Sequence, residues 1–296
     1  MNYWSFNETR CYNNLLQLTH LTTTTPYPSP QTVMDLQYVY TAGQNNGRIA
    51  QSVDGVLGET VNYTYDSLNQ LAKAETATSA WGSSYQYDGF GNLTSKLGTA
   101  NHNPGPPLVA MYDPATNRQM GVSYDANGNP TEGGYNSWDM ENRLVVSATD
   151  GNTMWGYDPW GKRVMKNGNA EADKQAGYYT GTWEFTFYGM RGQRLATVVC
   201  LYDNGPQHLY CGMGEMRDYF GGRLLWTRDQ TTNRTVVARD RLGSVRAVKT
   251  SAELSYLSYY PYGEERGSSA DGREKFGTYF RDLAGQTTRT NGITTI

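Results

Sequence analysis

Apolar and polar positions alternate along this chain over short stretches, and most of the alternating apolar residues are aromatic. A spacing of two places both rings of a pair on one face of a β-strand. Three pairs have this spacing: Tyr63/Tyr65, Tyr85/Tyr87 and Trp155/Tyr157. A leucine begins a second apolar stretch shortly after three of the turns: Leu71, Leu93 and Leu144. The pattern predicts antiparallel hairpins.

Past Gly177 the apolar stretches are longer and richer in β-branched residues. They predict strands over 178–188, 194–202 and 223–226, and a strand around Leu209 after a turn at Asp203–Pro206, with β-structure continuing to about Tyr262. Polar or Pro-rich composition predicts loops over 22–30, 101–107 and 167–177.

Between the strands a short motif recurs: an aromatic residue, Asp, two variable residues, then Gly or Asn. Its five copies are Tyr65-Asp66 with Asn69, Tyr87-Asp88 with Gly91, Tyr124-Asp125 with Gly128, Trp138-Asp139 with Asn142, and Tyr157-Asp158 with Gly161. A degenerate sixth copy starts at Tyr12-Asn13. An Asp that opens a turn accepts backbone N–H groups ahead of it, and Gly or Asn tolerates the left-handed conformation that closes the turn. The irregular spacing of the copies favours a winding sheet over a propeller.

Composition supports this interpretation. Leu, Ile, Val and Phe total only 47 of 296 residues, which by itself is typical of disorder. However, 24 Tyr and 7 Trp supply buried area, and the net charge of −3 causes little self-repulsion. With 33 Gly, 33 Thr and 22 Asn, the chain is poor in helix formers. The fold class expected is all-β.

Charge and cysteine content exclude several functions. A pI near 5.7 without a basic run gives no footprint for nucleic acid. No apolar run is long enough to span a bilayer, and no export signal is visible at the N-terminus. Three cysteines do not describe a disulfide framework, although Cys200 and Cys211 can form a hairpin staple.

The repeats resemble the YD repeats of the Rhs family, which includes Tc toxin shell components and teneurins. A second motif resembles the start of the Rhs repeat-associated core. This core motif comprises Asp240, Leu242, Gly243, Ser244, Arg246, Tyr260, Pro261, Tyr262, Gly263 and Glu264. The resemblance covers about Phe6 to Asp282 and implies part of a hollow β-shell that encloses a toxin. It implies a YD-repeat segment over 1–177 and a continuation into the core over 178–282.

The family's self-cleavage aspartates should follow Asp282, but no carboxylate follows it in this sequence. If the codons that the genetic code permits for residues 285–296 are read in the frame that starts at the third base, they can encode residues expected of such a core. We therefore interpret 283–296 as a non-native or disordered tail, produced by a frameshift near Leu283 in a truncated fragment. No catalytic residue is carried over.

Motifs that imitate active sites have simpler explanations. Gly156–Arg163 spells most of a P-loop, but Arg163 stands where Ser or Thr must bind magnesium. The Asp-Pro pairs at Asp113 and Asp158 fit turns. Cys200, His208 and Cys211 lack a fourth metal ligand. His20 and His102 are expected in exposed loops.

The sequence thus predicts a non-enzymatic shell fragment without cofactor, metal site, small-molecule ligand, nucleic-acid partner or membrane span. The resemblance implies toxin cargo or further shell segments as partners, and a family that is secreted or bound to the cell surface. The alternative is a surface adhesion or carbohydrate-binding module that uses exposed Tyr and Trp. Unpaired strand edges of a fragment predict association or poor solubility.

Overall fold

The computed structural model describes residues 6–26, 29–41, 43, 46–131, 136–147, 153–173, 178–203, 208–220, 223–229, 233–267 and 274–279. The described chain is all-β, without an α-helix, and every strand pairing in it is antiparallel. Within these residues the chain divides into two compact units. The first contains 6–120 together with 236–279, and the second contains 121–235.

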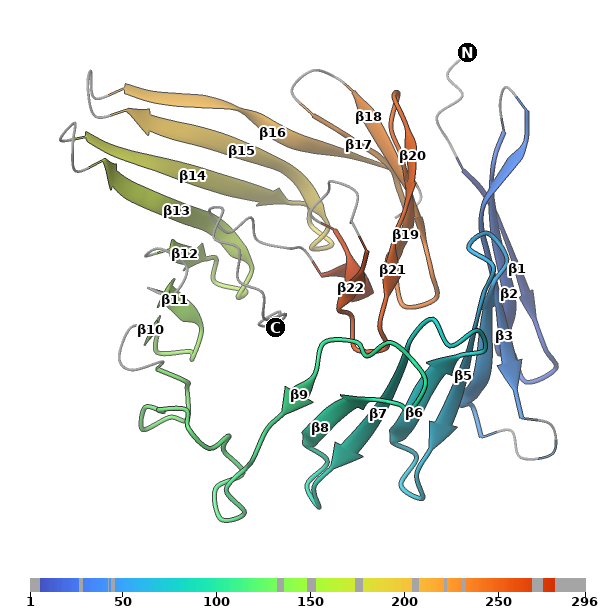
Figure 1. Ribbon diagram of the computed structural model, residues 1–296. Coiled ribbons are helices and arrows are strands. Elements are labelled where there is room, and N and C mark those ends of the chain that lie inside the picture. The colour runs from blue at the N-terminus through green and yellow to red at the C-terminus, as the bar shows by residue number, and fades with distance from the viewer. Residues whose placement is uncertain are drawn as a thin grey trace. The chain divides into compact units, whose positions relative to one another are not determined.

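The first unit is built on a nine-stranded sheet in which each strand pairs with the next along the chain (Figure 1). Its strands are β1 (Asn7–Tyr12), β2 (Leu18–Thr25), β3 (Gln31–Tyr40), β4 (Ile49–Asp54), β5 (Glu59–Tyr65), β6 (Leu71–Thr76), β7 (Gly82–Tyr87), β8 (Leu93–Gly98) and β9 (Leu108–Val109). This sheet-neighbour order follows from hairpins that succeed one another without a crossover.

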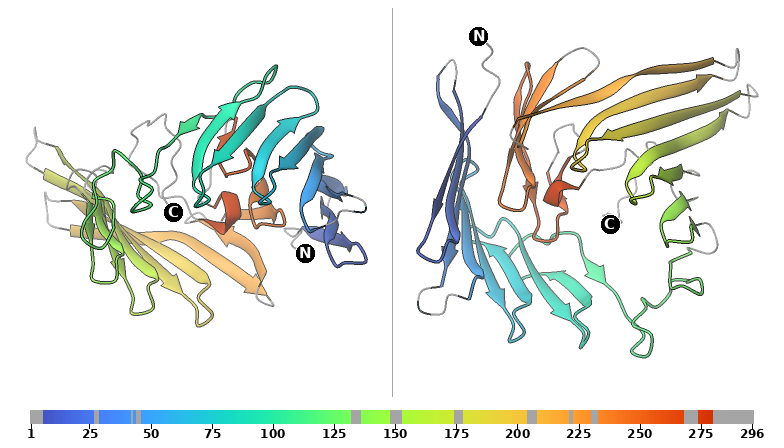
Figure 2. Two further views of the ribbon diagram at one scale, coloured as in Figure 1. Left: turned by 90° about the horizontal axis from the view of Figure 1, so that it is seen from below. Right: turned by 180° about the vertical axis from the view of Figure 1, so that it is seen from behind.

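A second layer of the first unit comes from the far end of the sequence. It contains β18 (Arg234–Arg239), β19 (Val245–Lys249), β20 (Leu254–Tyr256), β21 (Ser258–Tyr259), β22 (Glu265–Arg266) and the 3₁₀ turn η2 (Phe276–Thr278). Figures 1 and 2 show β19 beside β3. Ala238 and Ala247 complete an apolar core there with Leu21, Val33 and Met34, all nearly inaccessible to solvent. Burial of this core holds the two layers together.

The second unit contains one continuous run of hairpins. Its strands are β10 (Asn136–Trp138), β11 (Leu144–Ser147), β12 (Thr153–Tyr157), β13 (Arg163–Asp173), β14 (Tyr178–Tyr188), β15 (Arg194–Asp203), β16 (His208–Phe220) and β17 (Arg223–Arg228), and β17 pairs with the first residues of β18. Strands β13, β14 and β16 are the longest of the described chain, with 11, 11 and 13 residues.

Two predicted loops are corrected by the structure. Thr22–Thr25 belong to β2, where Thr23 and Thr25 are buried, because β-branched Thr fits a pleated surface. Asn167–Asp173 belong to β13, since the strand continues by pairing with β14 despite its polar sequence. The loop predicted over 101–107 is present. Residues 174–177, the Asn204–Pro206 part of the predicted turn and the tail 283–296 lie outside the described residues.

Candidate functional site: repeat turns and a docked core motif

Each repeat turn is closed by the carboxylate of its Asp. Asp66 Oδ1 accepts the backbone N–H groups of Leu68 at 2.9 Å and Gln70 at 2.8 Å. The same two acceptor contacts occur at Asp88, Asp125, Asp139 and Asp158. The fourth turn residue has a positive φ in every copy: Asn69, Gly91, Gly128, Asn142 and Gly161. Gly and Asn meet this conformational demand at low cost.

These hydrogen bonds lower the pKa of several turn carboxyls. The side-chain amide of Asn92 contributes most at Asp88, and that of Asn129 contributes most at Asp125. At Asp139 the backbone N–H of Arg143 is the largest cause. Hydrogen bonds to the charged form favour ionisation. The carboxyls of Asp88, Asp125 and Asp139 therefore stay ionised at neutral pH.

In four copies of the motif, at Tyr65, Tyr87, Trp138 and Tyr157, the aromatic residue before the Asp links its hairpin to the previous one. Tyr87 Oη donates to the carbonyl of Leu71 at 2.9 Å, and Tyr157 Oη donates to that of Leu144 at 2.8 Å. Trp138 Nε1 donates in the same way to the carbonyl of Pro130. Further contacts of this kind are Tyr40 to Leu18, Tyr65 to Ile49, Tyr188 to Arg163, Tyr219 to Arg194 and Tyr259 to Val245. In both units, this position of the motif is occupied by an aromatic side chain with a hydrogen-bond donor at the edge of its ring.

Turns of the same geometry lie beyond the five predicted copies. Asn13 Oδ1 accepts backbone N–H groups from Leu15 and Gln17, which places the degenerate copy among them. Asp240 Oδ1 accepts those of Leu242 and Ser244, so the first half of the core motif is itself a repeat turn. At Gly189 the backbone bonds form without a carboxylate. The sequence motif does not mark this copy, because Gly189 occupies the Asp position.

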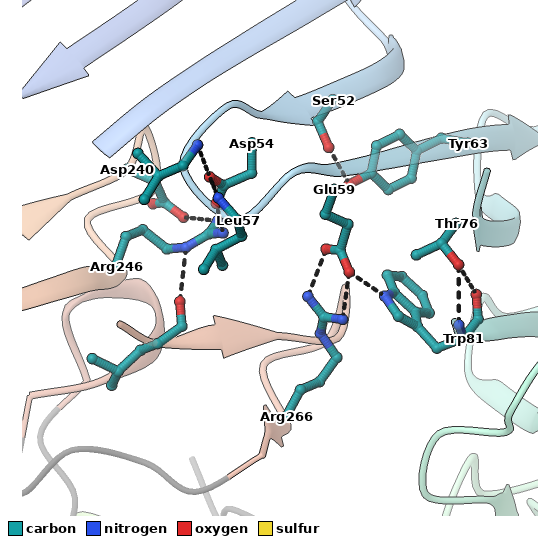
Figure 3. Close-up of polar contacts among 12 residues, drawn as sticks. Ser52, Asp54, Leu57, Glu59, Tyr63, Thr76, Trp81, Asp240, Arg246 and Arg266 are labelled. Carbon is teal, nitrogen blue, oxygen red and sulfur yellow. Dashed lines mark hydrogen bonds and ion pairs between the residues drawn. The ribbon is translucent and has the colours of Figure 1, made fainter. Parts of the chain in front are cut away.

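The core motif lies against the first sheet through charged pairs (Figure 3). Arg246 donates from its guanidinium to Asp54 Oδ2 at 2.9 Å and to the carbonyl of Leu257 at 3.1 Å. Its other terminal nitrogen lies 3.9 Å from Asp240. Asp54 Oδ1 meanwhile accepts two backbone N–H groups of its own turn. The two carboxylate oxygens of Asp54 and the three guanidinium nitrogens of Arg246 therefore each have a defined partner.

A second charged pair joins Arg266 in β22 to Glu59 in β5. Arg266 donates to both oxygens of Glu59, at 2.7 Å and 2.6 Å, in a bidentate arrangement (Figure 3). Trp81 Nε1 donates to the same carboxylate at 3.0 Å. The guanidinium carbon lies 5.0 Å from the Trp81 ring centroid and 5.8 Å from that of Tyr260. Bidentate geometry and ring stacking are what Arg provides and Lys does not.

Aromatic residues of the motif complete the contact. The Tyr260 ring meets Trp81 edge-on, with ring centroids 5.2 Å apart, and Tyr262 packs on Tyr85 at the same distance. Tyr262 also shares a hydrogen bond with Tyr87, and Glu264 pairs with buried Lys96. Burial raises the pKa of Tyr85, so its phenol stays neutral. We call the contact of Asp240–Arg266 with β4–β8 the core dock.

The remaining motif residues support this geometry. Gly243 and Gly263 both have positive φ. A Cβ on Gly263 would lie 2.6 Å from the Phe276 ring, so no larger residue fits there. Ser244 is completely buried, and its Oγ accepts the N–H of Gly277. Leu242 is half exposed at its turn tip.

The acidic and basic partners on the first sheet, Asp54, Glu59 and Lys96, were not singled out from the sequence. They lie 168 to 207 positions from the residues that they bind. No local pattern marks them, because an isolated Asp or Glu in a strand is normally a solvated residue.

The other candidate ligands have structural partners. The loop position expected for His20 was wrong: His20 lies in β2, which pairs with β3, and its Nε2 is 2.6 Å from Asp35 Oδ1. Cys200 and Cys211 face each other across β15 and β16 and form a disulfide. Among the described residues, no group of three His, Cys, Asp or Glu is arranged to hold a metal. No helix in that part of the chain is long and apolar enough to cross a membrane.

Comparisons with known proteins show which proteins this chain resembles. No family model matches the chain. The chain is 28% identical over 228 residues to the tRNA nuclease WapA of Bacillus subtilis (strain 168), covering 69% of this chain and 9% of that protein. It is 33% identical over 176 residues to the tRNA3(Ser)-specific nuclease WapA of Bacillus spizizenii, covering 49% and 7%.

Solved structures match over almost the whole chain. TcdB2-TccC3 without its hypervariable C-terminal region has a TM-score of 0.64 at 14% identity, covering 93% of this chain and 16% of that one. The Photorhabdus luminescens Tc holotoxin pore has a TM-score of 0.60 at 16% identity, covering 95% and 16%. The chain therefore has the all-β fold found within these Tc toxin proteins, and it spans a small part of each relative.

Proposed function

We propose that this chain is a non-enzymatic section of an Rhs-type shell wall, which encloses a toxin cargo together with further shell segments. The observation that carries the proposal is the core dock: Arg246, Tyr260, Tyr262 and Glu264, where the sequence resembles the start of an Rhs core, contact the first sheet. The YD-type turns and the hydrogen bonds from aromatic side chains between hairpins also support the proposal, because the same turn and the same bond recur as each hairpin adds to the wall.

The proposal assigns 1–177 to the repeat wall, 178–282 to its continuation into the core, and 283–296 to a non-native tail. The nuclease activity in the names of the WapA relatives belongs to those whole proteins, of which this chain spans 9% and 7%. The Cys200–Cys211 disulfide supports a location in an oxidising compartment, since such bonds are rare in a reducing cytosol.

Protease protection in a chimera tests the wall function. Residues 6–279 would replace the structurally matching section of the TcdB2-TccC3 shell, and the cargo's resistance to added protease would be measured. A closed chimeric shell keeps its cargo intact, whereas the same chimera with Arg266→Ala loses protection faster because the core dock is weakened. A well-folded chimera whose cargo is digested like free cargo contradicts the wall function.

Non-enzymatic behaviour has a separate test. The purified chain, incubated with tRNA, should leave the RNA intact at every ratio of protein to substrate. Specific cleavage that co-purifies with the folded chain and disappears on unfolding would overturn this part of the proposal.

A further inference from the structure

Arg48, in the connection between β3 and β4, has no carboxylate partner among the described residues. Its Nε donates to Asn46 Oδ1 at 2.9 Å, and its backbone N–H donates to the same oxygen at 3.2 Å. Its guanidinium carbon lies 5.1 Å from the Tyr65 ring centroid. Four other arginines of the first unit each pair with a carboxylate: Arg10 with Glu8, Arg239 with Glu274, Arg246 with Asp54 and Arg266 with Glu59. The guanidinium of Arg48 therefore differs from theirs in what surrounds it.

Arg143 occupies the equivalent position in a hairpin of the second unit. It directly precedes β11, as Arg48 directly precedes β4. In both hairpins the guanidinium lies over a tyrosine whose hydroxyl donates to the first carbonyl of that strand: Tyr65 to Ile49 and Tyr157 to Leu144. The residue before each arginine has a positive φ: Gly47 and Asn142. The two hairpins thus hold an arginine in the same geometry.

The two hairpins differ in the charge around this arginine. Arg143 Nε lies 2.7 Å from Asp139 Oδ2, and its Nη1 lies 2.8 Å from Glu141 Oε2. These carboxylates belong to residues four and two positions before the arginine. The corresponding positions before Arg48 hold amides in the sequence: Gln44 and Asn46. An amide carries no charge, so the positive charge of Arg48 is not neutralised as that of Arg143 is.

Arg48 also lines a cavity of about 180 Å³ within the first unit. Polar side chains and tyrosines share this lining, and no Asp or Glu belongs to it: Thr41, Asn46, Tyr63, Thr64 and Tyr65. The volume is that of about six water molecules, which suits a carboxylate with a short carbon chain. It lies below the roughly 300 Å³ at which sites for larger ligands begin. The size of the cavity therefore favours a small organic acid.

The charges around the cavity favour an anion. Burial raises the pKa of Tyr63 and that of Tyr65, so both phenols stay neutral at neutral pH. The positive charges of Arg241 and Arg48 oppose this shift at Tyr65, which shows that both act at the cavity. The neighbouring carboxylate of Asp240 already accepts two backbone N–H groups of its own turn. The cavity thus combines positive charge with a neutral polar lining.

We propose that the cavity at Arg48 binds the carboxylate of a small organic acid of roughly two to four carbons. The terminal nitrogens of Arg48 donate to this carboxylate, as the guanidinium of Arg143 does to the carboxylates of its own turn. Asn46 holds Nε, and the Tyr65 ring supports the plane of the guanidinium, so the fork is oriented before the ligand arrives.

NMR of the full chain labelled with ¹⁵N-arginine tests the inference. The Nε–Hε signal of Arg48, identified by its loss in Arg48→Lys, should shift saturably during titration with sodium acetate or sodium succinate. Acetamide, the neutral analogue of acetate, and sodium chloride at matched ionic strength should cause no saturable shift. The Nε–Hε signal of Arg143 is the internal control and should stay in place, because its carboxylate partners are already present.

Asn46→Glu gives the sharper variant. It places a carboxylate two positions before Arg48, where Glu141 lies relative to Arg143. The new side chain should occupy the guanidinium and weaken acetate binding roughly tenfold. The control Ala115→Glu adds the same charge at an exposed turn beyond β9 and should leave acetate binding unchanged.

Three results would each overturn the inference: no saturable shift at Arg48, an equal shift at Arg143, or undiminished acetate binding in Asn46→Glu. The first two come from the unmodified chain, so they do not depend on whether a variant folds. The wall function stands or falls separately in the chimera, because this inference uses none of its evidence.

Discussion

The two units of this chain place charge and apolar surface in opposite ways. In the first unit, a core of Leu21, Val33 and Met34 lies between layers, and charged pairs join the second layer to β4–β8. In the second, Lys166 and Arg217 are buried while apolar residues on the other sheet face remain open. In the first unit, the buried face of the sheet is the one on which the second layer packs. Experiments that perturb one unit should therefore leave the other unaffected.

The largest effect is expected from removing an acceptor in the core dock. Glu59→Ala leaves Arg266 and Trp81 without their shared carboxylate. Breaking a largely buried ion pair on one side costs about 3–4 kcal/mol, because the remaining charge is uncompensated. Urea unfolding followed by Trp fluorescence should show a lower midpoint for the first unit.

Glu75→Ala is the matched control for this change. Glu75 pairs with Lys73 on an exposed part of the same sheet, and such surface pairs contribute about 0–1 kcal/mol. Equal losses in the two variants would contradict a stabilising role of the core dock.

Reduction of the disulfide should act on the second unit alone. Cys200 and Cys211 are 11 positions apart, and closing a loop of this length contributes about 2–3 kcal/mol through the entropy of the unfolded chain. Thermal unfolding should be measured with and without a thiol reductant. The reductant should lower the melting temperature of the second unit and leave that of the first unit unchanged.

Cys11→Ser controls for the exposed free thiol, and this variant should respond to reductant like the parent chain. A shift of both transitions would mean that the two units unfold together.

The bonds between hairpins should contribute equally in both units. Tyr65→Phe and Tyr157→Phe each remove one donor to a main-chain carbonyl, while the arginine stacked on either ring remains in place. Loss of one such bond costs about 1 kcal/mol. Chemical denaturation should show this loss as a lower free energy of unfolding of the unit that contains the substituted Tyr. The control Tyr279→Phe, at an exposed ring, should have no effect.

Acid should weaken the turns of both units, with the smallest effect per site. Hydrogen bonds lower the folded-state pKa of Asp88 and Asp125 below the usual 3.8. Their contribution is therefore complete above the unfolded value and is lost as pH falls below about 3.8 through the lower folded values. Asp125→Asn keeps an acceptor oxygen and removes the charge, so it should flatten the decline of melting temperature between pH 5 and about pH 2.5. An unchanged slope would argue against turn carboxylates as its cause.

The extent to which sequence predicts this structure follows the range of each interaction. Turn residues such as Asp66 and Asn69 were recognisable because donors and acceptor lie within four positions. The strand over 178–188 was correctly bounded, whereas Asn167–Asp173 was wrongly assigned to a loop because its pairing with β14 outweighs its composition. The partners Asp54 and Glu59 could not be predicted, since their roles arise only when residues about 200 positions away dock on them.

The prediction of association through open edges stays a prediction. The edge strand β1 carries Glu8 and Arg10 opposite buried Thr23 and Leu21, so its charges lie on the core-facing side. Inward-pointing charges of this kind discourage a further strand from pairing. At the other end of the sheet, β9 is only two residues long. Sedimentation of the purified chain would measure whether these features keep it monomeric.

The bonds from ring donors to main-chain carbonyls have a consequence for how such a chain can change through evolution. Because each acceptor is a peptide group that every amino acid possesses, a hairpin makes few demands on the identity of its neighbour. Tyr and Trp both fulfil the donor role, and Leu, Pro and Arg all serve as acceptor residues. Gene duplication, deletion or exchange of whole hairpins would therefore preserve the joints between them, and the length of the protein could vary without compensating mutations at each new junction.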